Sequence, residues 1–222
     1  MKIKIIVASA TVFVLFGGVL GVQQYISTQI TSKIEQEMPK ASGISASVPL
    51  VDVPSNITSD SIKSAHINIK NFVLKENSTK SSLDISASNI SKAKPTQVGS
   101  LEVTATIPAS TITQSSEFSG AQIVGNTLQV SVGPGGVGTA LLIPKYSNSQ
   151  IYFELQSVSF LGNQIPASSL PAELQNQIKS RSQRSLTPPK GLTVESVSLS
   201  SKGLSVKMSG SNIQLGNLGS SL

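Results

Sequence analysis

Apolar side chains recur at every second position through most of the chain after residue 61, and this alternation limits the fold more than any other feature. Residues 83–87 and 101–107 show it clearly, with a polar side chain between each two apolar ones. This is the period of a strand with one buried and one solvated face. The phase changes near Asn71, which predicts a bulge or bend there. The same pattern predicts further strands at residues 62–74, 128–132, 140–143, 151–160, 192–199 and 204–208.

Two segments have helical spacing instead. Residues 25–38 repeat isoleucine every four positions, including Ile30 and Ile34, which predicts an amphipathic helix. Residues 166–181 place Leu174 and Ile178 on one face, which predicts a second, shorter helix that tolerates proline in its first turn. Between the first helix and the first strand, residues 42–56 are predicted to be a loop, because prolines at two positions exclude a central strand.

The N-terminus has the character of a membrane leader. Residues 5–22 carry no charge, and a helix of roughly 20 apolar residues crosses a hydrocarbon core of about 30 Å. Lys2 and Lys4 favour a cytoplasmic N-terminus and an extracytoplasmic remainder. Both a single-pass signal anchor and a cleaved signal peptide fit residues 1–23, so the protein is expected at the cell membrane or secreted to the cell envelope. We predict one domain over residues 24–215 and a flexible tail over residues 216–222.

Charged residues make up only 13% of the chain, against a usual share of about 25%, so the surface is rich in hydroxyl groups. The net charge of +6 is concentrated towards the C-terminal third, where Lys179, Arg181 and Arg184 follow the second helix. Such a basic end suits anionic lipid headgroups, although a solvated face explains it equally well. Nucleic acid is not an expected partner, because the chain has no Trp, few aromatic residues and no nucleic-acid motif.

No group of residues predicts covalent chemistry. His66 has no Asp, Glu or Cys at metal-ligand spacing and no G-x-S-x-G elbow, so we expect a structural role. Residues 133–138 match G-x-G-x-x-G, but the segment after them is too short and too β-like to be the required helix, which makes them a turn. A hydrolase of envelope polymers would need the fold to gather two of the dispersed carboxylates. We therefore predict no enzymatic activity, no cofactor and no metal.

The C-terminal motifs resemble those of a known family. Residues 191–197 are Gly-Leu-Thr-Val-Glu-Ser-Val and residues 202–210 are Lys-Gly-Leu-Ser-Val-Lys-Met-Ser-Gly. With the leader, the amphipathic helix, the strands and the proline-introduced helix, they resemble the LmeA-like phospholipid-binding proteins of actinobacterial cell envelopes. The resemblance implies an α+β fold in which a curved antiparallel β-sheet wraps on a long N-terminal helix, with a shorter helix added, similar to half of a tubular lipid-binding fold. The chain departs from the family at the early apolar loop, where Val48-Pro49-Leu50-Val51 lacks aromatic residues.

The same resemblance implies a phospholipid or membrane partner and a non-covalent role in envelope lipid or lipoglycan metabolism. A concave apolar sheet closed by striped helices can leave a groove for acyl chains. The expected lining is Ile30, Ile34, Val103, Phe153, Leu174 and Ile178, with Lys179, Arg181 and Arg184 at the headgroup or membrane surface. Two alternatives stay open. The stripes can simply fill a packed core. The chain can also be a β-rich cell-surface structural or interaction domain without a ligand groove.

Overall fold

The computed structural model describes residues 28, 31–32, 35, 41–49, 59–73, 80–93, 96–115 and 118–214. These residues form mostly antiparallel β-sheet with short helices, so the predicted α+β class is confirmed. They group into two compact units. One contains the described parts of residues 6–105, 188–195 and 207–222, and the other those of residues 106–187 and 196–206.

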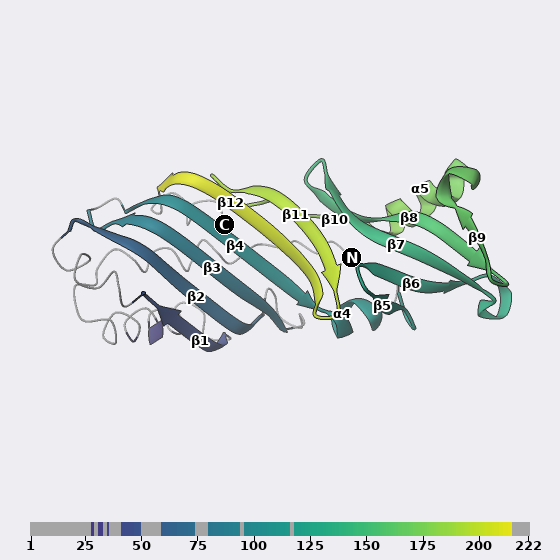
Figure 1. Ribbon diagram of the computed structural model, residues 1–222, viewed down its shortest axis with the longest axis horizontal. Helices are drawn as coiled ribbons and strands as arrows, with labels where there is room; N and C mark the ends of the chain where they lie inside the picture. The colour runs from purple at the N-terminus through teal and green to yellow at the C-terminus, as the bar shows by residue number, and fades with distance from the viewer. Residues whose placement is uncertain are drawn as a thin grey trace. The chain divides into compact units, whose positions relative to one another are not determined.

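The first sheet has six strands in the order β1-β2-β3-β4-β12-β11, which Figure 1 shows side by side. Cross-strand partners such as Ile67 with Ile85 and Ile69 with Leu83 set the register so that apolar side chains share one face. All four are fully buried, and each stabilises the fold by about 1.5–3 kcal/mol. The strands are β1 (Ser42–Ser47), β2 (Ser61–Val73), β3 (Lys80–Ser91), β4 (Gln97–Pro108), β11 (Thr193–Ser200) and β12 (Gly203–Gln214).

The predicted irregularity near Asn71 is confirmed as a register shift in β2. Ile69 pairs with Leu83 and Phe72 with Ser81, so β2 carries one residue more than β3 between these two pairs. The extra residue reverses the alternation, and Phe72 is therefore buried, as Ile69 is.

The loop predicted at residues 42–56 is wrong at its start, where β1 runs from Ser42 to Ser47. The strand pairs along β2, with Ile44 opposite Ile69 and Ala46 opposite Ile67. It ends before Pro49, and it lies at the edge of the sheet, where only one side needs backbone partners. Ile44 and Ala46 alternate with serines, but this pattern is short and lies next to Pro49, so the sequence alone favours a loop.

The second sheet has the order β10-β8-β7-β6-β5, with β9 paired to β8 (Figure 1). The prediction of a single sheet thus differs from the structure, because alternation shows that a strand is half-buried but does not show which strand lies beside it. A second register shift, at Leu141 and Leu142, explains the changed phase of the apolar residues at the end of β8. The strands are β5 (Gln122–Val124), β6 (Thr127–Val132), β7 (Gly138–Ser147), β8 (Gln150–Phe160), β9 (Asn163–Pro166) and β10 (Arg184–Ser185).

The helix predicted at residues 166–181 is divided into a 3-10 turn and an α-helix. Leu170 is extended, with φ −100° and ψ 154°, because a residue before proline avoids the helical region. The Gln175 side-chain amide donates to the carbonyl oxygens of Ala167 and Leu170, at 2.7 and 3.2 Å, and joins the two pieces. The helices are α4 (Ala109–Thr113), η3 (Pro134–Gly136), which forms the predicted glycine-rich turn, η4 (Ala167–Ser169) and α5 (Ala172–Ser182).

The predicted long N-terminal helix falls mostly outside the described residues. Thr28, Thr31, Ser32 and Glu35 are helical, whereas Ile30 and Ile34 are not among the residues described. Within the described part of the chain, no helix combines the length and apolarity needed to cross a bilayer. The leader at residues 1–23 and the tail at residues 216–222 lie outside that part, so the expected domain boundaries and half-tubular shape stay predictions.

The predicted C-terminal hairpin is confirmed as β11 and β12, with Gly203 at the end of its turn. Gly203 has φ +129°, and a Cβ atom there would lie 1.9 Å from the Ile107 carbonyl oxygen. Only glycine allows the turn to approach the end of β4 this closely, where the Ala109 N–H donates to the Lys202 carbonyl oxygen at 3.2 Å.

Candidate functional site

A pocket of about 480 Å³ lies between α5 and one face of the second sheet. Helix α5 packs along β8, as Figure 1 shows. The pocket volume falls within the range of about 300–1,000 Å³ that is typical of ligand sites. The lining residues are mostly apolar, with one cation: Phe118, Val130, Val132, Ala140, Leu142, Ile178, Arg181 and Ser182.

The sheet side of the pocket comes from the alternation of β6 and β7. Val130 pairs with Ala140, and Leu128 pairs with Leu142, so these side chains share one face. Leu128 is fully buried, whereas Val130 further along the strand is only half-buried. Along β6, the face that carries Leu128 and Val130 therefore belongs to the packed core at Leu128 and to the pocket wall at Val130.

The helix side depends on how α5 is fixed to the sheet. The Phe153 backbone N–H of β8 donates to the Ser182 hydroxyl oxygen at 2.9 Å, and both residues are buried. The Phe153 ring also meets the edge of Phe118, with ring centroids 5.1 Å apart. These contacts hold the last turn of α5 against β8, and the Ile178 and Arg181 side chains of this helix line the pocket.

The three predicted basic residues have different surroundings. Lys179 lies over the Tyr152 ring, with its Nζ 4.4 Å from the centroid. Arg184 donates to the carbonyl oxygens of Arg181 and Gln183, at 3.0 and 2.8 Å, and so caps the C-terminal end of α5. The exposed Arg181 lines the pocket. Lys179 and Arg181 also stabilise the helix, because cations near a C-terminus oppose its dipole.

The structure brings some of the predicted site residues together. Ile178 and Arg181 both line the pocket, and Phe153 supports it through Phe118 and Ser182. Leu174 is 40% exposed and is not a lining residue, and Val103 is fully buried in the first sheet, in the other unit. Ile30 and Ile34 lie outside the described residues. The lipid-binding roles themselves stay predictions.

Sequence reasoning missed the sheet wall of the pocket. Val130 and Val132 were recognised as strand residues, and Ala140 and Leu142 as part of a short apolar run. Their half-buried alternation was the only local signal, and it does not show that α5 covers this face. Phe118 lies in a connection without regular structure and gave no signal.

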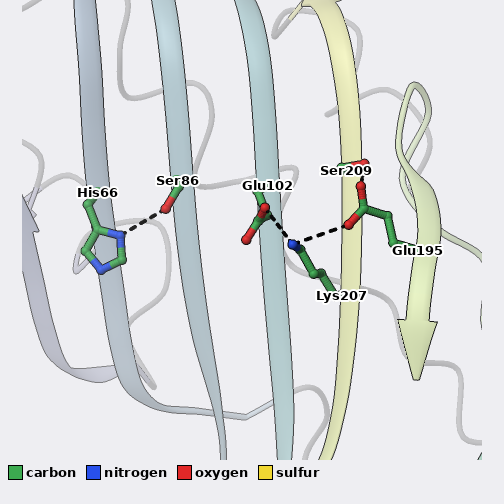
Figure 2. A network of polar contacts seen from close by, with 6 residues as sticks. All are labelled: His66, Ser86, Glu102, Glu195, Lys207 and Ser209. Atoms are coloured by element: carbon green, nitrogen blue, oxygen red, sulfur yellow. Dashed lines mark hydrogen bonds and ion pairs between the residues drawn. The ribbon is translucent and has the colours of Figure 1, made fainter. Parts of the chain in front are cut away.

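A row of polar side chains crosses the first sheet, as Figure 2 shows, and its charged members are partly exposed to solvent. Lys207 of β12 bridges Glu102 of β4 and Glu195 of β11, with its Nζ 2.9 and 3.4 Å from the two carboxylates. The Ser209 hydroxyl donates to Glu195 as well. This hydrogen bond, followed by Lys207, lowers the pKa of Glu195, and the bond to Glu102 is the main cause of the raised pKa of Lys207.

The fold thus gathers two carboxylates, the arrangement that a glycoside hydrolase would need. A general acid requires a carboxyl group whose pKa is raised so that it carries a proton. The pKa of Glu195 is shifted the other way, and Lys207 lies between it and Glu102. Glu102, Lys207 and Glu195 are arranged as an exposed cross-strand ion-pair network.

His66 has acidic and hydroxyl neighbours that its sequence surroundings did not reveal. Its Nε2 lies 3.3 Å from Asp84 and its Nδ1 3.1 Å from the Ser86 hydroxyl, both on the neighbouring strand β3. His66 and Asp84 are each close to half exposed. Among the described residues, no group of three or more potential metal ligands occurs.

A second hollow, of about 600 Å³, lies beside His66, Ser86 and Glu102. Its lining combines several serine side chains, His66 and Glu102 with the apolar residues Val48, Pro49, Ala65 and Ala87. The pocket under α5 is the better candidate for the predicted site, because Ile178 and Arg181 of that site both line it.

Comparison with known proteins identifies one family. The model of a family described as LmeA-like phospholipid-binding matches residues 14–209, which is most of the chain. The resemblance predicted from the motifs at residues 191–210 is thereby confirmed. No curated protein matches the chain, and neither does any solved structure.

Proposed function

Because the chain belongs to the LmeA-like phospholipid-binding family, we propose that it binds a phospholipid non-covalently, with an acyl chain in the pocket under α5. The observation that carries this proposal is the combination of apolar walls with Arg181, the one cation among the described lining residues. Burial of an acyl chain against such walls gains about 25 cal/mol for each Å² removed from water. The pocket therefore provides the apolar contact that a phospholipid tail requires.

Arg181 is the residue that we assign to the lipid phosphate. A guanidinium group donates two parallel hydrogen bonds to phosphate oxygens, which a lysine ammonium cannot do. Lys179 and Arg184 lie close to it in the sequence and add positive charge, whereas Glu173 lies in the first turn of α5, at the other end of the helix. The headgroup is thus expected at the C-terminal end of the helix.

The protein is proposed to act outside the cytoplasm, tethered to a membrane or released into the cell envelope, in envelope lipid or lipoglycan metabolism. The uncharged run at residues 5–22 and the lysines before it support this location. The alternative, a surface interaction domain with a filled interior, is disfavoured by the pocket of about 480 Å³.

The test uses the full chain in vesicles that contain a phospholipid with a photoreactive group at the end of one acyl chain. After illumination, cross-linked peptides are mapped by mass spectrometry. We expect cross-links at the pocket-lining segments of β6, β7 and α5, in addition to any at the leader. Ile178→Asp should abolish the pocket cross-links, because a carboxylate in the apolar wall opposes acyl-chain binding.

Leu174→Asp is the matched control, because it puts the same charge on the same helix at a residue that is 40% exposed. The control should keep the cross-links of the wild-type chain. The proposal is wrong if the cross-links are confined to the leader, or if the two variants behave alike while both remain folded by circular dichroism.

A further inference from the structure

Three apolar side chains project into solvent at one end of the second sheet. Val137, Phe160 and Leu161 are 50%, 43% and 76% exposed, and we refer to them as the apolar tip. Val137 belongs to the β6–β7 connection, and Phe160 and Leu161 belong to the β8–β9 turn. Gly138 pairs with both Val132 and Phe160, so the two connections lie at the same end of the sheet (Figure 1).

The segments that carry the apolar tip have no charged side chain. Residues 118–144 contain none, and neither do residues 155–172. An exposed apolar cluster whose own segments carry no charge enters hydrocarbon without the desolvation cost that a carboxylate or ammonium group in them would add. Because phospholipid is the partner class of the family, a bilayer is the occupant that this chemistry fits.

The backbone conformation at the apolar tip is a second, independent observation in favour of a functional role for Leu161. Leu161 has φ +49° and Gly162 has φ +83°, and two successive positive φ values are those of a type I′ hairpin turn. Such turns strongly favour Asn-Gly, because a bulky residue is strained in this region. Leu161 is strained and about three-quarters exposed, so neither backbone preference nor packing within the described residues accounts for a leucine here.

The apolar tip is continuous with the pocket under α5. A Cβ atom at Gly138 would lie 3.1 Å from the Val132 side chain and 3.3 Å from the Phe160 ring, so these two side chains flank Gly138 on one face. Val132 lines the pocket, and Phe160 belongs to the tip. Apolar surface therefore extends from the exposed end of the sheet to the pocket wall.

We propose that the apolar tip inserts into the acyl-chain region of a phospholipid bilayer and that an acyl chain passes along Phe160 and Val132 to the pocket. The proposed insertion is supported by the exposure of the three tip residues, by the absence of charged residues from their segments and by the strained turn at Leu161. The acyl-chain route rests additionally on the proposed function. The docked surface is thus the end of the second sheet formed by the β6–β7 and β8–β9 connections.

The chain contains no tryptophan, so a single introduced tryptophan reports its own surroundings. The full-length Val137→Trp variant is reconstituted in phosphatidylcholine and phosphatidylglycerol vesicles whose acyl chains carry bromine, a short-range quencher. The control is Val124→Trp, because Val124 is also 50% exposed but lies in β5, next to the turn at the other end of β6. We expect quenching and a blue-shifted emission for Val137→Trp, and neither for Val124→Trp.

Leu161→Asn, added to the Val137→Trp variant, separates insertion from folding. Asn-Gly is the preferred sequence for this turn, so the melting temperature should stay the same or rise, while the quenching should be lost. Equal quenching at both tryptophans, or quenching that survives Leu161→Asn, would overturn the proposal. So would the absence of quenching at Val137→Trp, which would leave a protein partner as the occupant of the tip.

The photo-cross-linking experiment distinguishes this failure from a failure of the pocket. If cross-links remain at Ile178 and the β6–β7 wall while the tip tryptophan is not quenched, acyl-chain binding in the pocket is supported and bilayer insertion of the apolar tip is rejected. If the tip tryptophan is quenched but the pocket shows no cross-link, insertion of the apolar tip is supported and the acyl-chain route to the pocket is rejected.

Discussion

The pKa of Glu195 on the protein surface is lowered mainly by a single hydrogen bond. The Ser209 hydroxyl is the largest cause of its lowered pKa, ahead of Lys207. A carboxyl group whose pKa is lower in the folded chain stabilises the fold above its unfolded pKa. That contribution is lost as the pH falls through the folded pKa.

Ser209→Ala is therefore expected to raise the pKa of Glu195 towards its ordinary value while leaving the Lys207 contact in place. The pKa is measured by following the Glu195 side-chain resonance during an NMR pH titration. Ser205→Ala is the control, because the Ser205 hydroxyl lies on the same strand but is 3.1 Å from the Thr106 hydroxyl instead. An unchanged Glu195 titration in Ser209→Ala would show that the hydrogen bond does not set the pKa.

At the scale of single elements, α5 depends on one buried hydroxyl group for its position on β8. Ser182→Ala removes the acceptor of the Phe153 N–H, and an unsatisfied buried N–H costs about 1–3 kcal/mol. We expect faster amide hydrogen exchange throughout α5 and a lower free energy of unfolding. Ser180→Ala should change neither quantity much, because the Ser180 hydroxyl only contacts the Gln177 carbonyl oxygen at an exposed position.

The β11–β12 hairpin depends on Gly203 in a different way. In Gly203→Ala, the new methyl group would overlap the Ile107 carbonyl oxygen, and the backbone would also be strained, so we expect a loss of about 1–3 kcal/mol or more in denaturant unfolding. Gly125→Ala tests a positive φ without a close contact: its φ of +61° lies in the left-handed region, and no atom is within 4 Å of the added Cβ. A loss in Gly203→Ala no larger than that in Gly125→Ala would contradict a contribution from the close approach to β4.

At the scale of the whole molecule, the two sheets of the described residues carry surfaces of different chemistry. The first sheet buries a continuous apolar face and presents a charged row to solvent, where Lys207 joins Glu102 and Glu195. The second sheet leaves part of its apolar face as a pocket and ends in the uncharged apolar tip. The proposed contacts with lipid therefore lie on the second sheet and on α5, which packs along β8.

The sequence by itself determined most strands, both changes of phase within strands, the β11–β12 hairpin and the family. These features depend on local periodicity, turn residues and short motifs, and each is set by residues close together in the chain. The strand at Ser42–Ser47 was not predicted, because its alternation of Ile44 and Ala46 with serines is short and is soon followed by Pro49.

Only the tertiary structure decided which segments meet. Val132 and Ile178 line one pocket, and Glu102 and Lys207 form one ion pair, although in each case a long stretch of chain separates the two residues. Alternation records that a side chain is buried, but it does not record the partner against which it is buried. The pocket, the polar row and the apolar tip depend on those partners, so strand order and the packing of α5 had to be known before any of them could be recognised.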